Sequence, residues 1–526
     1  MNRTLPLAAL AWLLVFSPGP AQAKDLMTPA EAQRIGMVES WHRPIGAIGG
    51  ARSIVDMQLW VQKDTQRQYV EVVQSGTSGG ELVLERIPID LRDAFGNPIG
   101  LREAERQAKL SVLKLKRRSV EAQTRTTTVD QVRLYVLSRD GLLSAYDAES
   151  GEQLWAVRVG NPALGYGTLG IDDSYVTVVN GTSMFQIRAS DAEITDSEGG
   201  LPRRLPAGRP MTPRRFDGIP LHGAVHSGPY VVVPITRNGI ETHLLDGTSI
   251  QPEFEIFAGQ ALTKPAVYPG STRIMWPTDR EFVYAMETDG QPSMLFRLDT
   301  QGLVEGGITA ASDHRFFFGS TGGRVYGLRA SRTGEVLWNQ SLGEPFYKAP
   351  FVSGNQVLFV SSYGHLHNLS AETGEPLWAQ PAYGIDQVFA HVGGQFVGRD
   401  RNQHLIFIDA QSGQITQRLR DVSVEYPVIN HDTDRIYLAS PGGMVQCLRP
   451  QRSELPVFLR EIPSGPVEAE VAAEPTPPAA AATPEPTEEP EPVDPFGGGA
   501  DPFGGGADPF GGADPFGGGG ADPFGN

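Results

Sequence analysis

Cysteine is nearly absent from this sequence. The 526 residues include only Cys447, so no disulfide can form within the chain and its stability must come from packing. Cys447 alternates with apolar neighbours in a segment with the pattern of a strand, where we expect a small buried hydrophobic residue and not a nucleophile. Because Cys447 lies far from the N-terminus, a lipidated N-terminal cysteine is also excluded.

Long apolar runs are scarce as well. Beyond the N-terminus, no stretch is apolar for the roughly 20 residues that a membrane-spanning helix requires. The N-terminus itself has the pattern of a secretory signal, with Arg3, the apolar run Leu5–Phe16 and small residues at Ala21–Ala23; a buried N-terminal helix is the alternative. We expect cleavage after Ala23 and a soluble protein in the periplasm or at the cell surface.

Positive charge is in the minority. The chain has 44 lysines and arginines against 61 acidic residues, a net charge of −17. From Gln451 to Asn526 there are 14 acidic and 2 basic residues. This balance disfavours nucleic-acid binding. The sequence also lacks a glycine-rich phosphate loop and the Gly-x-Ser-x-Gly turn of serine hydrolases.

The sequence does contain a repeat. Residues 333–338 read Thr-Gly-Glu-Val-Leu-Trp and residues 373–378 read Thr-Gly-Glu-Pro-Leu-Trp, so the turn glycine and the tryptophan recur after 40 residues. Seven of the eight hairpins follow a short first strand, and an outer strand comes after the hairpin in all units but the last, which predicts an all-β, eight-bladed β-propeller with four-stranded antiparallel blades. Seven blades are the alternative. The eight hairpins begin near Arg133, Ser174, Pro229, Arg273, Arg315, Gln356, Gln395 and Arg435.

The last unit lacks an outer strand. A propeller closes best when the N-terminus supplies the missing strand, because closure removes exposed sheet edges. We therefore expect the region Trp41–Val61 to pair with the final blade, with Trp41 in the place of the missing repeat tryptophan. The predicted propeller spans residues 41–450, after an N-terminal extension at residues 24–40.

Two insertions interrupt the propeller pattern, near residues 76–109 and 196–218. The second is a rim loop with four prolines and five arginines; it either is solvated or meets an anionic partner. In the N-terminal region the pattern predicts a helix Pro29–Arg34 capped by Thr28, strands Ser53–Val61 and Gln68–Val73, a charged helix Gly100–Lys109 and a half-exposed strand at Leu113–Lys116.

The C-terminal segment, residues 451–526, is rich in proline, alanine and glutamate and then repeats Asp-Pro-Phe-Gly-Gly. Such a composition cannot bury enough apolar surface to offset the entropy of ordering, so we expect disorder. The tail is either a spacer or a set of weak aromatic contacts that bind one partner by avidity. The repeated aromatic residues are Phe496, Phe503, Phe510, Phe516 and Phe524.

The segment Leu134–Trp155, with its Asp-Gly hairpin, Asp-Ala-Glu-Ser-Gly turn and following Leu-Trp, resembles the repeat of the pyrroloquinoline-quinone-like (PQQ-like) propeller superfamily. The resemblance extends in weaker form to Leu448. It implies an eight-bladed propeller, which in some members is a quinone-dependent dehydrogenase and in others binds no cofactor. Among the latter, the sequence looks most like the propeller component of the bacterial outer-membrane β-barrel assembly machinery, which acts as a scaffold.

The repeated residues have structural explanations. Aspartates at the turns can accept backbone hydrogen bonds, glycines can adopt positive φ, and tryptophans can fill the wedge between blades. We expect them to be fold residues and not a site. They are Asp147, Asp409, Gly151, Gly334, Gly374, Gly413, Trp155, Trp338 and Trp378.

Catalytic and metal-binding patterns are weak. The resemblance implies that a dehydrogenase would need calcium, a catalytic aspartate and commonly two adjacent cysteines. With Cys447 alone, this chain cannot have the adjacent cysteines. The pairs His222/His226 and His365/His367 have no identifiable third ligand, whereas a zinc site needs three or four. We therefore expect no catalytic, cofactor or metal site, and a monomeric scaffold that binds envelope proteins through its faces or rim. A quinone-dependent dehydrogenase and a glycan- or peptidoglycan-binding propeller are the alternatives.

Overall fold

The computed structural model describes residues 26–45, 50–75, 81–91, 93, 97–194, 203–248 and 253–460. The chain divides into two units, Met1–Val467 and Glu468–Asn526, and the described residues all belong to the first. The predicted signal segment and the phenylalanine repeats lie outside them.

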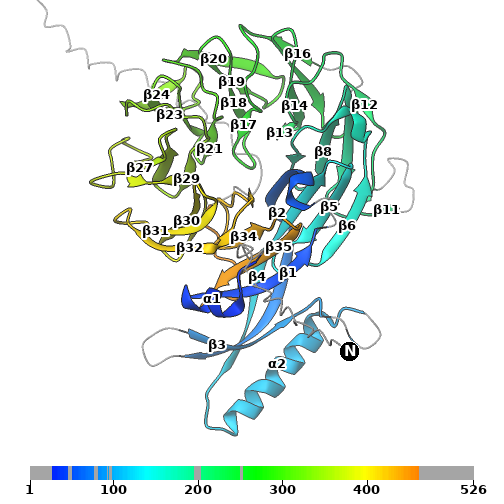
Figure 1. Ribbon diagram of the computed structural model, residues 1–526. Helices are drawn as coiled ribbons and strands as arrows, with labels where there is room; N and C mark the ends of the chain where they lie inside the picture. Colours follow the sequence, from blue (N-terminus) through cyan, green and yellow to red (C-terminus); the bar gives the residue numbers. More distant parts are fainter. Residues whose placement is uncertain are drawn as a thin grey trace, which may run out of the picture. The chain divides into compact units, whose positions relative to one another are not determined.

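The architecture is all-β. The described residues form seven four-stranded sheets, one five-stranded sheet and one two-stranded ribbon, with antiparallel pairing. Figure 1 shows successive sheets arranged around a ring, and the first strands of neighbouring sheets contact one another from β7 to β29. These features confirm the prediction of a β-propeller fold.

Five of the four-stranded sheets use strands in strict chain order. They are β13 (Val225–Ser227), β14 (Tyr230–Ile235), β15 (Gly239–Leu244), β16 (Glu253–Ile256); β17 (Ala266–Val267), β18 (Arg273–Pro277), β19 (Phe282–Glu287), β20 (Ser293–Asp299); β21 (Thr309–Ala311), β22 (Arg315–Gly319), β23 (Arg324–Arg329), β24 (Glu335–Ser341); β25 (Phe351–Ser353), β26 (Gln356–Val360), β27 (His365–Ser370), β28 (Ala382–Tyr383); and β29 (Ile385–Val392), β30 (Gln395–Asp400), β31 (His404–Asp409), β32 (Ile415–Ser423).

The remaining sheets include chain from the insertions or the termini. They are β3 (Glu81–Pro88), β2 (Ile54–Ser75), β4 (Gln123–Ser138), β5 (Leu142–Asp147), β6 (Gln153–Arg158); β7 (Gly170–Ile171), β8 (Tyr175–Asn180), β9 (Ser183–Arg188), β12 (Arg214–Arg215); β33 (Tyr426–Pro427), β34 (Ile436–Ala439), β35 (Met444–Pro450), β1 (Met37–Pro44); and the ribbon β10 (Ala192–Ile194), β11 (Arg203–Leu205). Short 3-10 helices lie at η1 (Gly50–Ser53) and η2 (Pro162–Leu164).

The middle strands are apolar on both faces because each sheet is packed between two others. In β22, Phe316 and Phe318 belong to a core cluster shared with the preceding sheet, while Phe317 belongs to a cluster shared with the following one. Side chains alternate along a strand, so a strand packed on both sides has a continuous apolar sequence.

Where a repeat has its tryptophan, the indole joins that sheet to the next. The indole Nε1 of Trp338 donates a hydrogen bond of 3.0 Å to the backbone oxygen of Ala371 in the following repeat. A Cβ on Gly374 would lie 2.6 Å from that indole, so the ring rests on the glycine of the next turn. Trp378 and Gly413 repeat the arrangement. The predicted wedge role of these residues is confirmed.

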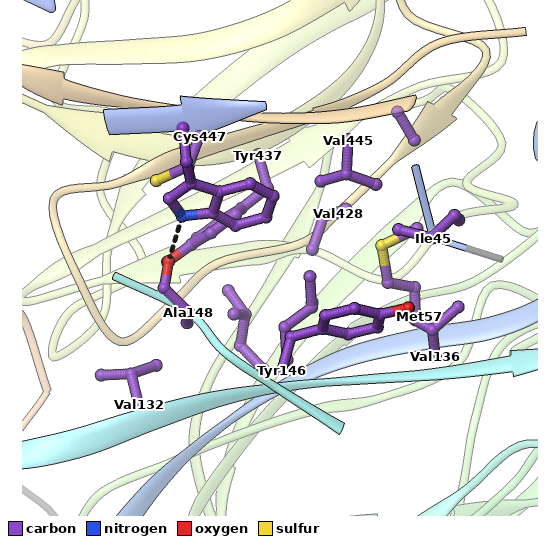
Figure 2. Packing of buried hydrophobic residues seen from close by; sticks show 14 of the residues in the cluster. Ile45, Met57, Val132, Val136, Tyr146, Ala148, Val428, Tyr437, Val445 and Cys447 are labelled. Atoms are coloured by element: carbon purple, nitrogen blue, oxygen red, sulfur yellow. Dashed lines mark hydrogen bonds between the residues drawn. The ribbon is translucent and has the colours of Figure 1, made fainter. Parts of the chain in front are cut away.

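The N-terminal strand completes the last sheet, as the missing strand predicts. β1 pairs with β35, with Trp41 opposite Cys447. The indole of Trp41 donates a hydrogen bond of 2.9 Å to the backbone oxygen of Ala148 (Figure 2), and a Cβ on Gly151 would lie 2.5 Å from the ring. Trp41 therefore takes the place of the missing repeat tryptophan. The predicted pairing segment was too long, because Ile54 onward pairs with β4.

The chain on both sides of the first predicted insertion differs from its prediction. The two expected strands, Ser53–Val61 and Gln68–Val73, are one strand, β2, because both parts pair with the same long strand β4 and β2 accommodates its extra residues as an irregularity between Gln62 and Gln66. The expected strand at Leu113–Lys116 is wrong. These residues are the last turn of helix α2 (Gly100–Lys116), which packs through Val112 and Leu115 on the strands.

Three further segments add to the core of the unit. Helix α1 (Pro29–Arg34) has the predicted Thr28 cap, completed by Glu31. Within the predicted rim loop, β12 pairs with β9 and is the fourth strand of that sheet.

The expected disorder does not begin at Gln451. Residues 451–460 pack on the last sheet, where Phe458 joins the core cluster and bridges to Thr433.

No helix in the described part of the chain has both the length and the apolar character to cross a membrane.

Candidate functional site

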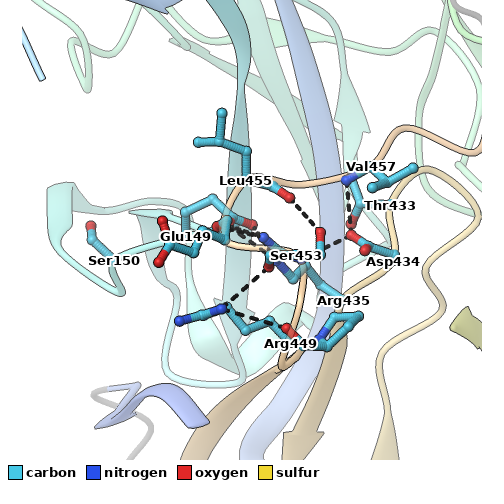
Figure 3. Close-up of polar contacts among 12 residues, drawn as sticks. Glu149, Ser150, Thr433, Asp434, Arg435, Arg449, Ser453, Leu455 and Val457 are labelled. Carbon is cyan, nitrogen blue, oxygen red and sulfur yellow. Dashed lines mark hydrogen bonds and ion pairs between the residues drawn. The ribbon is translucent and has the colours of Figure 1, made fainter. Parts of the chain in front are cut away.

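A buried ion network fastens the first sheet to the last (Figure 3). Arg435 precedes β34 and is fully buried. Its guanidinium donates to Glu149 at 3.0 Å, to Asp434 at 2.8 Å and to the backbone oxygen of Glu454 at 3.0 Å. Although burial opposes it, Glu149 and Asp434 raise the pKa of Arg435. The cation is neutralised from within the fold, so the network is structural.

Cys447 lies inside the closure, opposite Trp41 and Tyr437 in the sheet. It is fully buried, and burial raises the pKa of its thiol well above the ordinary value. The thiolate, which is the nucleophilic form, is therefore not populated near neutral pH. Cys447 is a packing residue, as the strand pattern predicts.

The first histidine pair does not converge. His222 Nε2 lies 2.9 Å from the backbone oxygen of Ala261. His226 lies 2.7 Å from both Thr177 and Asp172 through its two ring nitrogens. Each imidazole has separate partners, so the two histidines do not form a common ligand set.

The second histidine pair has a third residue beside it. His365 and His367 are on one face of β27, and the carboxylate of Glu344 lies 2.7 Å from His365 Nδ1 and 3.6 Å from His367 Nε2. Burial lowers the pKa of His367, which favours the neutral imidazole. Burial acts to raise the pKa of Glu344, but Ser361 and His365 hold it below its ordinary value.

Sequence reasoning missed Glu344 because it is 21 residues from His365. It follows β24 in the preceding sheet, and only the packing of one sheet on the next brings it to β27. Its only sequence signal is an acidic residue in the Gly343–Pro345 turn at the end of an outer strand.

A cavity of about 500 Å³ lies along the predicted rim loop. Its arginine, Arg214, donates a hydrogen bond of 2.9 Å to the backbone oxygen of Leu244 and another to Gln186. The side chain therefore braces two neighbouring sheets. Its lining residues are Gln186, Met211, Thr212, Arg214, Arg215, His243, Asp246 and Gly247.

The outer halves of β2 and β4, with β3 and α2, extend beyond the ring of sheets (Figure 1). We call this element the extension. Ala104 and Ala108 of α2 pack against Val70, Val72 and Ile87, which gives the extension a small core of its own.

Exposed leucines gather on the extension. Leu82 is 58% exposed and Leu113 57%, far more than an ordinary core-facing leucine. A groove of about 260 Å³ lies between β3 and the end of α2. An apolar surface with a polar rim is typical of a protein-binding site. The exposed leucines are Leu82, Leu84, Leu91, Leu101, Leu110 and Leu113, and the groove is lined by Leu84, Glu85, Ser111, Lys114, Leu115 and Arg118.

Glu71 anchors the extension on the face opposite α2. Its buried carboxylate pairs with Arg86 at 2.6 Å and Arg125 at 2.7 Å and accepts a hydrogen bond of 2.9 Å from Thr127. Arg86 also reaches Glu454 at 2.8 Å, in the segment that follows β35. Burial acts to raise the pKa of Glu71, but these partners hold it below its ordinary value.

We expect Glu71→Gln to lower the free energy of unfolding at pH 7 by about 1–3 kcal/mol, because buried partners lose a charged acceptor. A carboxyl group whose pKa is lower in the folded state stabilises the fold at pH values above its ordinary pKa of 4.5. This contribution to stability is lost as the pH falls through the pKa of the folded state. The difference in Tm between wild type and variant should therefore begin to narrow near pH 4.5 and close only below the lower pKa of the folded state. Glu103→Gln, in an exposed pair, is the control; a pH-independent difference would contradict the role of the Glu71 charge.

Comparison with known proteins gives the family. The model described as outer membrane protein assembly factor BamB matches residues 103–196 and 273–466, more than half of the chain. No curated protein matches. One similar solved structure is BamB from Moraxella catarrhalis, with 18% identity and a TM-score of 0.46; the match covers 61% of this chain and 92% of that chain. Two others are the designed protein Ika8, with 15% identity, and Sqt1 from Saccharomyces cerevisiae, with 9% identity. Each of these two has a TM-score of 0.43, and the match covers 60% of this chain and 92% of the other. On the family match, this chain belongs to the PQQ-like propeller family described as outer membrane protein assembly factor BamB.

Proposed function

We propose that this protein is an exported, non-catalytic scaffold of the bacterial cell envelope that binds other proteins during the assembly of outer-membrane proteins. The observation that carries the proposal is the match to the BamB family over more than half of the chain. The N-terminal signal pattern supports export to the periplasm.

The proposed scaffold is an eight-bladed propeller. The seven four-stranded sheets and the five-stranded sheet of the described chain supply a blade each. Trp41 and Arg435 tie the last blade to the first. Such closure supports binding because a rigid platform loses little entropy when a partner docks.

We assign partner binding to the extension. Its leucines are exposed although they stand on an element with its own core and a buried anchor at Glu71. Lys114 and Arg118 border the groove beside them. The surface is therefore suited to a protein segment that carries both apolar and acidic side chains.

Leu113→Asp tests this assignment. The side chain is 57% exposed, so the free energy of unfolding should change by no more than about 0.5 kcal/mol. A charge at the centre of an apolar contact should nevertheless abolish cross-linking to outer-membrane assembly proteins of the same cell. The measurement is recovery of those proteins after cross-linking in cells, together with Tm of the purified variant.

Leu164→Asp is the matched control, because Leu164 is 61% exposed on η2, away from the extension. It should leave recovery unchanged. Equal recovery with both variants would show that the extension is not the binding surface. Failure of the wild-type protein to recover any assembly protein would overturn the scaffold proposal itself. The phenylalanine repeats are a second proposed contact, by avidity.

A further inference from the structure

The cluster of Glu344, His365 and His367 has the composition of a metal site. Side chains two residues apart on a strand point to the same face, which sets the two imidazoles of β27 side by side. Glu344, three residues after β24, adds a carboxylate. One ligand atom from each residue lies within 4.8 Å of the others, and this is the one such group in the described part of the chain.

An ion pair alone does not satisfy these groups. His365 uses Nδ1 and Glu344 uses Oε1 in their contact of 2.7 Å. His367 Nε2 and Glu344 Oε2 are both shielded from solvent and have no hydrogen-bond partner, and the 3.6 Å between them is too long for a hydrogen bond. Buried polar atoms are rarely left unpaired. The two unpaired atoms therefore lie next to each other.

We propose that Glu344, His365 and His367 bind a divalent transition-metal ion of the zinc class. Two imidazole nitrogens with one carboxylate oxygen suit zinc, whereas calcium and magnesium prefer oxygen ligands throughout. Zinc bonds such ligands at about 2.0–2.2 Å, so an ion among three atoms no more than 4.8 Å apart needs only side-chain adjustment. Three protein ligands leave a fourth position for water or for a side chain of a bound partner.

The next repeat offers a natural contrast. His404 begins β31 as His365 begins β27, and its Nδ1 also faces a carboxylate, Asp400, at 3.1 Å. Two residues on, that strand has Ile406 in place of a second histidine. Arg418 supplies a positive charge at 3.5 Å from the Asp400 carboxylate. In this blade the carboxylate comes from the same hairpin and a cation of the protein lies beside it, whereas in the β27 blade the carboxylate of Glu344 comes from the preceding sheet and faces a second histidine.

The test is metal titration of the full-length mature protein, purified without a histidine tag and stripped with a chelator. We expect one Zn²⁺ or Co²⁺ per chain, a visible absorption band from Co²⁺, and a rise in Tm on addition of Zn²⁺. His367→Gln and Glu344→Gln should each weaken binding by more than about tenfold, since even the outer-shell partners of metal sites contribute that much. His404→Gln should bind as the wild type does.

Two results would overturn the proposal. One is a wild-type protein that binds neither ion with defined stoichiometry. The other is a His365→Gln/His367→Gln double variant that keeps wild-type affinity. Tm of the metal-free variants separates loss of ligands from loss of fold. If His367→Gln is unfolded then Glu344→Gln decides, because this substitution preserves size while it removes the charge and replaces one carboxylate oxygen by an amide group.

Discussion

Replacing Trp41 by alanine is expected to lower the free energy of unfolding by about 3–5 kcal/mol. The indole is buried, donates to the backbone of Ala148 and rests on Gly151. Its loss leaves a cavity between the first and the last sheets, which are joined there by chain segments more than 100 residues apart. Urea denaturation of the mature protein measures the change.

Trp378→Ala is the matched control for Trp41, because it is buried to a similar degree and makes the same kind of bond, to Ala410. Its cost in stability should be similar. The difference should appear in hydrogen exchange, where Trp41→Ala exposes the amides of β1 and β35 while Trp378→Ala leaves them protected. A loss below about 1 kcal/mol for Trp41→Ala, well under the usual range, would show that closure does not depend on the indole.

Arg435→Met should be as damaging, with an expected loss of about 3–5 kcal/mol, because it leaves the carboxylates of Glu149 and Asp434 inside the fold without their cation. Thermal or urea unfolding measures it. The double variant Arg435→Met/Glu149→Gln should lose less than the sum of the single changes, since it also removes one of the two carboxylates that Arg435 neutralises.

The repeat provides a control for Arg435 as well. Arg315 occupies the corresponding place before a hairpin, but its guanidinium contacts only the backbone and hydroxyl of Ser312 near the surface. Arg315→Met should change stability by no more than about 0.5 kcal/mol. If the Arg315 and Arg435 variants were equally stable, the network in Figure 3 would have no part in closure.

The repeat made the architecture predictable. An Asp-Gly turn, a tryptophan and a glycine at fixed spacing specify one blade by local geometry, and the missing outer strand of the last unit pointed to the N-terminus. The place of Trp41 followed from the missing outer strand of the last unit alone. Prediction failed where the pattern of apolar and polar residues was ambiguous. Residues 113–116 alternate between leucine and lysine as a strand does, but Val112 and Leu115 also have the spacing of one helix face. Packing of that face on β2 selects the helix.

The candidate sites were harder to predict than the fold. Glu344 approaches the two histidines only because consecutive blades stack. Residues 451–460 look like the start of a low-complexity tail, yet the backbone of Glu454 accepts from Arg435 and Phe458 enters the core. Both depend on contacts between blades, which no single repeat encodes.

The pairing of β1 with β35 constrains the order in which the molecule can mature. A ribosome releases residues 37–44 about 400 residues before their partner strand, so this segment remains without its partner until the other sheets have been synthesised. Premature termination anywhere in the ring would leave that edge unpaired. An unpaired edge of this kind is a site at which a neighbouring chain can pair.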